Sequence, residues 1–243
     1  MLNHYNFNSS NMLKFSDFME KSALAQRPSV MKSPMKMDIA KNLINLGAVK
    51  FSPQNPFTYA SGLKGPIYCD NRLILSQVEF RDQVISSFIK VIEENKLTFD
   101  HLGGIATAGI PHAAFVADRM KRSMVYVRPK AKDHGRKNQV EGLYKTGDKV
   151  LLFEDLVNQG ASLEDSMAGL NGAGLKCDAC LCVVDYEMSG AQERLRNLSI
   201  QLFALTDFTS LTMAAFELNL INKDGLTLLK EWHADPKAWS AKF

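Results

Sequence analysis

The sequence has no hydrophobic run near the length of about 20 residues that a helix needs to cross a bilayer, so it predicts no transmembrane span. It has only four cysteines in 243 residues, and no secretory signal accompanies them, which argues against a disulfide scaffold. Charge of one sign is not in large excess, because the formal net charge is +3. Nucleic acid and acidic membranes therefore gain no support as partners, and we expect a cytoplasmic protein.

Three of the cysteines stand close together. Cys177, Cys180 and Cys182 have a spacing that could serve a metal, but they adjoin the apolar run 179–184, and no nearby histidine completes four ligands. We interpret this run as a buried strand with free thiols. The sequence thus assigns no residue directly to a metal.

The first 36 residues differ in composition from the rest, with Asn and Ser at the start and two X-Pro breaks. We expect an N-terminal extension of unknown role, with a short helix over 13–24; a translation start at Met35 or Met37 would also explain this segment. Residues 37–243 are expected to form a single domain, because 46% of the chain is hydrophobic and its strands are evenly spread.

Strand and helix patterns alternate from residue 37 on. Ser76 and Glu79 have the spacing of a capping box at the start of a helix, and Pro111 suits the first position of another. Such alternation predicts an α/β fold with a central parallel sheet flanked by helices. The expected strands cover residues 57–61, 66–69, 101–106, 124–128, 150–153 and 176–185, and the expected helices cover 38–46, 76–92, 111–120 and 163–170.

The most informative stretch changes character twice. Four apolar residues, 150–153, are typical of a strand buried on both faces, and Glu154 and Asp155 follow where that strand is expected to end. A turn, 158–162, then leads into a helix, so backbone N–H groups converge on a point that favours phosphate. No Walker lysine is present, and carboxylates beside a phosphate cradle fit a sugar phosphate better than a nucleoside triphosphate. A plain strand-to-helix turn capped by Ser162 is the alternative.

This strand, acidic pair and turn resemble the phosphoribosyl-pyrophosphate (PRPP) motif of the type I phosphoribosyltransferases. The resemblance implies that Asp155 takes part in catalysis and that the stretch binds PRPP. Its departures lie in the turn, where the family commonly has Ser or Thr, Thr, Gly, Gly and Ser. If the backbone needs a positive φ at Ala161, we expect strain and a weakened PRPP affinity. The implied PRPP-binding residues are Glu154, Asp155, Leu156, Val157, Asn158, Gln159, Gly160, Ala161 and Ser162.

A second motif, residues 61–72, reads Ser-Gly-Leu-Lys-Gly-Pro-Ile-Tyr-Cys-Asp-Asn-Arg. It resembles the orotate phosphoribosyltransferase family, in the branch that reads Ser-Pro-Ile-Tyr-Cys-Asp-Asn-Arg, with Gly65 in place of the first Ser. The resemblance implies that Arg72 and Asn158 bind orotate. A surface hairpin, with Arg72 in a surface ion pair, is the alternative.

The resemblance extends from residue 37 to about 239 and sets the expected architecture. It implies the type I phosphoribosyltransferase fold, a central parallel sheet flanked by helices with a small N-terminal hood. The hood would comprise about 37–75 plus a C-terminal part, and the core about 76–205. Residues 103–114 pass from a strand through glycine into a helix, and the family uses this loop near the pyrophosphate. We interpret His112 there as helix-facing rather than as an acid or base.

The polar stretch 126–142 contains many basic side chains around a glycine. Such charge runs are usually solvated loops, yet this density suits a lid over a leaving group with several negative charges. It resembles the family's mobile catalytic loop, which implies that Arg128, Lys132 and His134 contact PRPP and that Lys132, Asp133 and His134 take part in catalysis. In the family this loop reaches the neighbouring subunit's site, so the resemblance implies a homodimer.

The reaction that the resemblance implies is transfer of the 5-phosphoribosyl group from PRPP to orotate. It gives orotidine 5′-monophosphate and pyrophosphate in de novo pyrimidine (UMP) biosynthesis. The resemblance also implies Mg²⁺ as cofactor, carried by PRPP rather than held by a certain set of protein ligands. Two alternatives stay open. One is a phosphoribosyltransferase for another base, since the PRPP motif is shared, and the other is a non-catalytic PRPP-binding regulator, which the altered turn alone supports.

Overall fold

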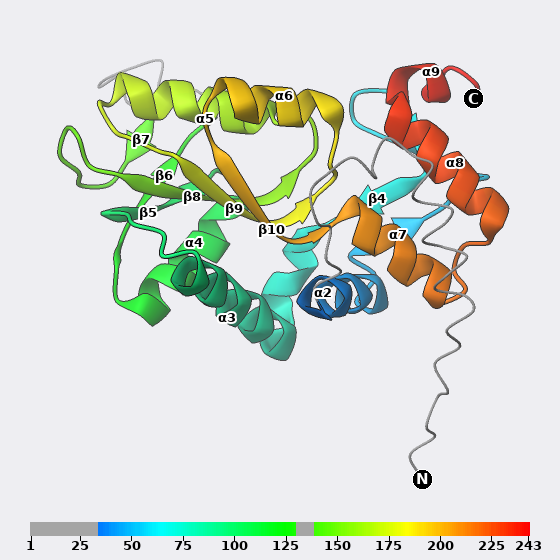
Figure 1. The fold of residues 1–243 in the computed structure, drawn as a ribbon, viewed down its shortest axis with the longest axis horizontal. Coiled ribbons are helices and arrows are strands. Elements are labelled where there is room, and N and C mark those ends of the chain that lie inside the picture. The colour runs from blue at the N-terminus through cyan, green and yellow to red at the C-terminus, as the bar shows by residue number, and fades with distance from the viewer. Residues whose placement is uncertain (1–33, 130–138) are drawn as a thin grey trace, which may run out of the picture. The chain divides into compact units, whose positions relative to one another are not determined.

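The computed structural model describes residues 34–129 and 139–243, so the helix expected over 13–24 lies outside the described residues. At the centre is a six-stranded sheet (Figure 1). In order across the sheet, its strands are β10 (Gln201–Asp207), β9 (Ala179–Asp185), β8 (Val150–Val157), β5 (His101–Ile105), β6 (Ser123–Val127) and β7 (Val140–Glu141). Neighbouring strands are parallel except β6 and β7, which are antiparallel. The predicted α/β class with a central parallel sheet is confirmed.

Helices cover both faces of the sheet. α5 (Ala161–Gly172) and α6 (Ser189–Asn197) lie on one face, and α3 (Val78–Glu94) and α4 (Gly109–Met120) lie on the other (Figure 1). The interiors of β8 and β9 are therefore removed from water on both sides. This burial explains why their sequences are continuous apolar runs rather than alternating ones.

The cysteines follow this burial pattern. Cys180 and Cys182 have no exposed surface within β9, which confirms that the cysteine-containing run is a core strand. All four cysteines are free thiols. Within residues 34–129 and 139–243, no helix combines the length and the apolar composition needed to cross a membrane.

The strand order reverses between β5 and β8. From β5 the chain continues through β6 to β7 on one side, then returns to β8 and goes on to β9 and β10 on the other. At its carboxyl end β8 also outruns β5: their pairing stops at Phe153, whereas the pairing of β8 with β9 continues to Val157. The last residues of β8 thus have a strand on one side only. Ligands of open parallel sheets bind at such a reversal, beyond the carboxyl ends of the strands.

α4 begins directly against β8 because its first residue is glycine. A Cβ on Gly109 would lie 2.2 Å from the carbonyl oxygen of Phe153 and 3.2 Å from the Cα of Glu154. Only a residue without a side chain allows the start of the helix to pack this close to the acidic strand end. Pro111 is the third residue of α4, so the helix start expected at Pro111 was wrong. The proline is still tolerated, because N–H groups in the first turn have no intrahelical partner.

Two small antiparallel sheets lie beside the main one: β1 (Val49–Phe51) pairs with β4 (Ile67–Cys69), and β2 (Phe57–Thr58) pairs with β3 (Lys64–Gly65). The strand expected over 57–61 is therefore only two residues long. The hydroxyl of Tyr59 donates to the carbonyl of Ile67 and occupies the space that a Cβ on Gly65 would need, 2.2 Å away. The glycine that departs from the family branch thus accompanies a tyrosine packed beneath it.

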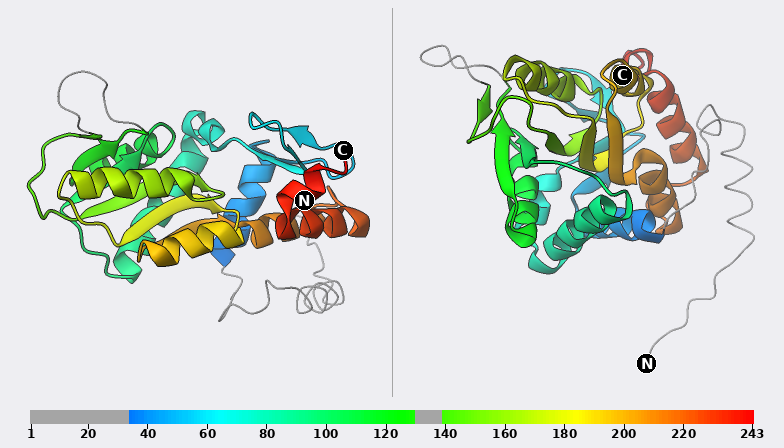
Figure 2. Two further views of the ribbon diagram at one scale, coloured as in Figure 1. Left: turned by 90° about the horizontal axis from the view of Figure 1, so that it is seen from above. Right: turned by 60° about the vertical axis from the view of Figure 1, so that its left-hand side comes forward.

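The C-terminal helices are α7 (Phe208–Glu217), α8 (Lys223–Ala234) and α9 (Pro236–Ser240). The helix α2 (Pro34–Asn45) packs on α7 and β10, and its Lys36 Nζ lies 2.6 Å from Asp207 Oδ2. The Lys64 amide donates to Ser240 Oγ at 2.8 Å. The first and last parts of the described chain therefore lie side by side at one end of the sheet (Figure 2).

The capping box expected at Ser76 was also wrong. Ser76 ends a 3₁₀ helix, η2 (Asn71–Ser76), and its hydroxyl donates to the Leu73 carbonyl. α3 begins at Val78, and the side chain of Gln77 does not cap it. A local sequence signature was overridden here because the preceding residues already form a helical turn of their own.

Candidate active site

The acidic pair lies at the carboxyl end of β8, where the strand order reverses. Glu154 is 6% exposed, and Asp155 is half-buried. The Glu154 carboxylate accepts two hydrogen bonds: the Asp155 amide donates to Oε1 and the Ser162 hydroxyl to Oε2, both at 3.0 Å. Glu154 thereby ties the strand end to the first turn of α5. The sequence suggested Ser162 only as a phosphate ligand or a helix cap, and its bond to Glu154 was missed.

Burial, together with the negative charge of Asp155, raises the pKa of Glu154 to about 8. Two carboxylates side by side at a partly dehydrated strand end resist simultaneous ionisation. The raised pKa favours the protonated form of Glu154 at neutral pH, and a bound cation or hydroxyl groups that donate hydrogen bonds to Glu154 would favour its ionised form.

The turn between β8 and α5 is built around Gly160. This residue has φ 75° and ψ 10° and precedes the first helical residue, Ala161. Leu156 is half-buried and Val157 buried within β8, while Gln159, Ala161 and Ser162 are exposed around the turn. The left-handed conformation falls on Gly160 and not on Ala161, so the condition under which we expected strain at Ala161 is not met. The glycine sits where only glycine is unstrained.

Asn158 has a polar atom available for a ligand. Its Oδ1 is buried and has no hydrogen-bond partner. Buried polar atoms of native proteins are nearly always paired, with protein, water or ligand. Asn158 therefore has the burial and the free acceptor expected of a ligand-binding side chain at this turn.

We predict that Gly160→Ala lowers the free energy of unfolding by about 1 to 2 kcal/mol, because a side chain in the left-handed region is strained. The added Cβ meets Ala191 only at an ordinary 3.5 Å, so the effect measures backbone strain rather than a clash. Urea unfolding of Gly160→Ala beside Ala161→Gly checks this. An equal or larger loss for Ala161→Gly would contradict the assignment of the turn.

The carboxyl end of β5 lies next to the acidic pair of β8. The chain passes through a cis peptide between Ala106 and Thr107 into α4. His112 is 1% exposed, and its ring meets Phe88 edge-on with centroids 5.9 Å apart. Burial lowers the pKa of His112 to about 4, so it is neutral at pH 7. This is the helix-facing position that the sequence suggested.

Arg72 and Asn71 lie on opposite sides of the same turn. The Arg72 side chain is 67% exposed and forms a bidentate pair with Asp70, with N–O distances of 2.6 and 2.9 Å. The guanidinium beside it holds the pKa of Asp70 below its usual value. Asn71 is instead 1% exposed, and its Nδ2 donates to the backbone carbonyl of Asp155 at 2.8 Å. Of the two, only Asn71 touches the acidic strand end.

Arg128 follows the end of β6. Its amide donates to the Gln139 carbonyl at 2.9 Å, and its guanidinium Nη1 lies 3.6 Å from Glu141 Oε1. Arg128 and Gln139 thus form the base of the segment 130–138. Lys132, Asp133 and His134 fall in that segment and lie outside the described residues.

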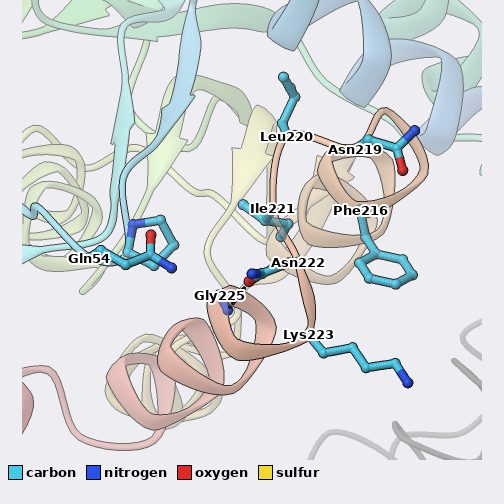
Figure 3. Close-up of a pocket in the computed structure, with 9 residues that line it drawn as sticks. Gln54, Phe216, Asn219, Leu220, Ile221, Asn222, Lys223 and Gly225 are labelled. Carbon is cyan, nitrogen blue, oxygen red and sulfur yellow. Dashed lines mark hydrogen bonds between the residues drawn. The ribbon is translucent and has the colours of Figure 1, made fainter.

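A separate hollow lies between the residues before β2 and the connection of α7 to α8 (Figure 3). Its lining includes Gln54, Phe216 and Asn222, and Lys223 is its one ionised side chain. None of its lining residues belongs to the acidic strand end or to the turn 158–162. We therefore assign no part of the reaction to it.

The carboxyl ends of β5 and β8 bring together the acidic pair, a glycine-centred turn and the N-terminus of α5. Phosphate groups commonly bind at helix N-termini, and ligands of parallel sheets commonly bind at the reversal point of the strand order, so this end of the sheet is the candidate site. The Phosphoribosyl transferase domain family matches residues 74–203, which include these elements. The class is therefore that of the phosphoribosyltransferases.

Relatives narrow the class. The orotate phosphoribosyltransferase of Coxiella burnetii is 40% identical over 202 residues, which are 83% of this chain and 97% of the relative. The solved orotate phosphoribosyltransferase of Aeropyrum pernix is 28% identical, with a TM-score of 0.65 over 76% of this chain and 99% of that one. The chain belongs to the orotate phosphoribosyltransferase family, whose activity serves pyrimidine biosynthesis.

A second solved structure supports the fold alone. Leishmania donovani UMP synthase is 24% identical with a TM-score of 0.69. The match covers 93% of this chain, but the chain spans only 45% of that protein. Both solved structures thus share the type I phosphoribosyltransferase fold with this chain.

Proposed function

We propose that the carboxyl ends of β5 and β8 hold PRPP while its phosphoribosyl group is transferred to orotate. The observation that supports this most directly is the acidic pair joined through Ser162 to the first turn of α5. Asp155 and Glu154 would accept hydrogen bonds from the ribose hydroxyls, and the turn 158–162 would bind the 5′-phosphate through its N–H groups. Leu156 and Val157 would contribute backbone to this cradle.

The chemistry is dominated by charge. A deprotonated ring nitrogen of orotate supplies the electron pair that forms the new bond to C1′ of the ribose. The bond between C1′ and pyrophosphate breaks, and pyrophosphate leaves with that electron pair. The residues assigned to the leaving group are Arg128, Lys132 and His134, with Asp133 between the last two. Fixed cations that meet developing negative charge lower the barrier, and closure over the site would strengthen them by excluding water.

Mg²⁺ fits this site as a companion of PRPP rather than as a resident metal. Among residues 34–129 and 139–243, no group of three or more His, Cys, Asp or Glu side chains is placed to hold a metal. Asp155 and Glu154 would hold the ion through carboxylate oxygens, together with oxygens of PRPP. When bound, the ion would neutralise charge on the departing pyrophosphate.

We further propose orotate contacts and an assembly. Asn158 would bind the pyrimidine through its buried, unpaired Oδ1, and Arg72 would do so after leaving Asp70.

A homodimer in which each 130–138 segment serves the neighbouring site is the proposed assembly. The sequence put the boundary between the N-terminal appendage, 1–36, and the single domain at residue 37; because α2 begins at Pro34 and Lys36 contacts Asp207, we propose the boundary at Pro34 instead. A chain that starts at Met35 retains the contact of Lys36 with Asp207 and tests that boundary.

We predict that PRPP binding at pH 7 releases a proton from Glu154. Its pKa of about 8 leaves the carboxyl mostly protonated, and ribose hydroxyls or Mg²⁺ favour the ionised form. Calorimetric binding enthalpies in buffers of different ionisation enthalpy measure the release. Glu154→Gln should remove that part of the release, while ionisation of PRPP itself remains. Identical release from both proteins would contradict the role given to Glu154.

The reaction is tested by the loss of orotate absorbance with PRPP and Mg²⁺, in parallel with uracil, adenine and hypoxanthine as acceptors. Turnover with orotate alone supports the proposal. Preferential turnover of another base would replace it by a phosphoribosyltransferase for that base. PRPP binding without turnover of any base would instead identify a regulator.

A further inference from the structure

The backbone of Asp155 lies beyond the reach of β5. The pairing of β5 with β8 ends at Gly104 and Phe153, so on this side no strand continues alongside Asp155. Side chains take the place of that strand. The Asp155 N–H donates to Glu154 Oε1 at 3.0 Å, and the Asp155 C=O accepts from Asn71 Nδ2 at 2.8 Å.

The carboxamide of Asn71 is held in one orientation. Cys69 Sγ donates to Asn71 Oδ1 at 3.3 Å, so the amide nitrogen is the atom that faces Asp155. Asp70 accepts from the Arg72 amide at 3.2 Å and caps the 3₁₀ turn. The turn directs Asp70 and Arg72 outward and buries Asn71, which is 1% exposed.

We propose that Asn71 is a positioning residue for the reaction, which acts by fixing the backbone of Asp155. Its bond joins segments 84 residues apart in the sequence and connects the motif that precedes α3 with the acidic strand end. It does not touch the reacting atoms. This inference rests on the role proposed for Asp155 in gripping the ribose.

The position of the contact sets the size of the expected effect. Without the Asn71 donor, the peptide after Asp155 loses its partner on the side where β5 is absent, and the carboxylate can drift. A misplacement of about 1 Å in a catalytic group can cost roughly 100-fold in rate. We therefore expect Asn71→Leu, which keeps the volume and removes the donor, to lower kcat/KM for PRPP about 10- to 100-fold.

The chain offers a matched control. Asn95, an exposed residue, also donates from Nδ2 to a backbone carbonyl, that of Val91, at 2.8 Å. It lies at the C-terminal end of α3, away from the acidic pair. Asn95→Leu removes the same kind of bond and should leave kcat and both KM values unchanged.

The experiment measures kcat, KM for PRPP, KM for orotate and Tm for the parent, Asn71→Leu and Asn95→Leu. If Asn71 positions the Asp155 carboxylate, Asn71→Leu should have a KM for PRPP about tenfold above that of the parent and a lower kcat. Its KM for orotate should stay within about twofold of the parental value. A purely structural role would lower the active fraction and leave both KM values unchanged, which would overturn the proposal. Asn71→Ser, which keeps a small polar group in the buried space, replaces Asn71→Leu if the latter does not fold.

Failure of this inference is distinguishable from failure of the proposed function. A parent chain that turns over orotate while Asn71→Leu keeps its PRPP parameters overturns the role of Asn71 alone. A parent chain without turnover overturns the proposed reaction, and calorimetric PRPP binding then decides the role of Asn71. Equal dissociation constants for parent and Asn71→Leu would refute it there too.

Discussion

Replacing Asp155 with Asn is expected to lower kcat/KM for PRPP by roughly 100- to 1,000-fold. The amide keeps the volume but loses the charge, and a hydrogen bond to a charged group contributes about 1.5 to 3 kcal/mol. At about 1.4 kcal/mol per tenfold change, the expected range corresponds to about 3 to 4 kcal/mol. This is the lower part of what two such bonds to ribose hydroxyls would contribute, because asparagine keeps one acceptor oxygen. Steady-state kinetics with varied PRPP and saturating orotate measure the loss.

The same substitution is expected to stabilise the fold. The charge of Asp155 helps to raise the pKa of Glu154 to about 8, and a raised folded-state pKa means that stability present at low pH is lost as pH rises from about 4.5 towards 8. Asp155→Asn removes part of that loss, so its Tm should exceed that of the parent by more at pH 8 than at pH 5. Asp118→Asn, at an exposed position of α4, is the control for a simple loss of charge. A Tm below that of the parent at pH 8 would contradict the coupling of the two carboxylates.

Lys132→Ala is expected to lower kcat by roughly 100- to 1,000-fold and to leave Tm nearly unchanged. Loss of one fixed group that stabilises transition-state charge commonly costs about 2.7 to 4 kcal/mol of barrier. Steady-state kcat and thermal unfolding of the two proteins give the comparison. Lys121→Ala removes an exposed lysine that pairs with Asp118 at 2.9 Å and should not alter kcat. Comparable rates for Lys132→Ala and its parent would remove Lys132 from the mechanism.

Mixing the two inactive variants tests the proposed homodimer. If the segment with Lys132 serves the neighbouring site, a dimer of Asp155→Asn and Lys132→Ala subunits contains one site with both native residues. Random exchange would then restore about a quarter of parental activity. No recovery despite proven subunit exchange would place Lys132 and Asp155 of one site in the same subunit.

The sequence predicted the sheet and the place of the acidic pair because both follow from local composition. The apolar run 150–153 predicted a strand buried on both faces, with the acids at the place where it ends. β8 instead continues to Val157, so Glu154 and Asp155 lie within the strand, just beyond its pairing with β5. The position of Gly160 at the left-handed turn was not predicted, since four polar or small residues surround it and each is compatible with a turn.

Other features depended on packing between distant segments. Ser76 has the spacing of a cap, but η2 already uses the residues before it. In the motif 61–72, the sequence pointed to the charged Arg72 as the functional residue. In the structure it is Asn71 that contacts the strand with the acidic pair. The only sign in the sequence was that the uncharged Asn71 stands between two charged residues, Asp70 and Arg72. Nothing local indicated a partner 84 residues away.

The unequal lengths of β5 and β8 have a consequence for redesign. A longer β5 would offer a regular ladder partner to Asp155 and would satisfy its peptide groups without help from side chains. A sheet with β5 extended in this way would have more complete backbone hydrogen bonding. The added residues of β5 would, however, occupy the space beside Asp155 in which the ribose is proposed to bind. We therefore expect that extending β5 to make the sheet more regular would weaken substrate binding.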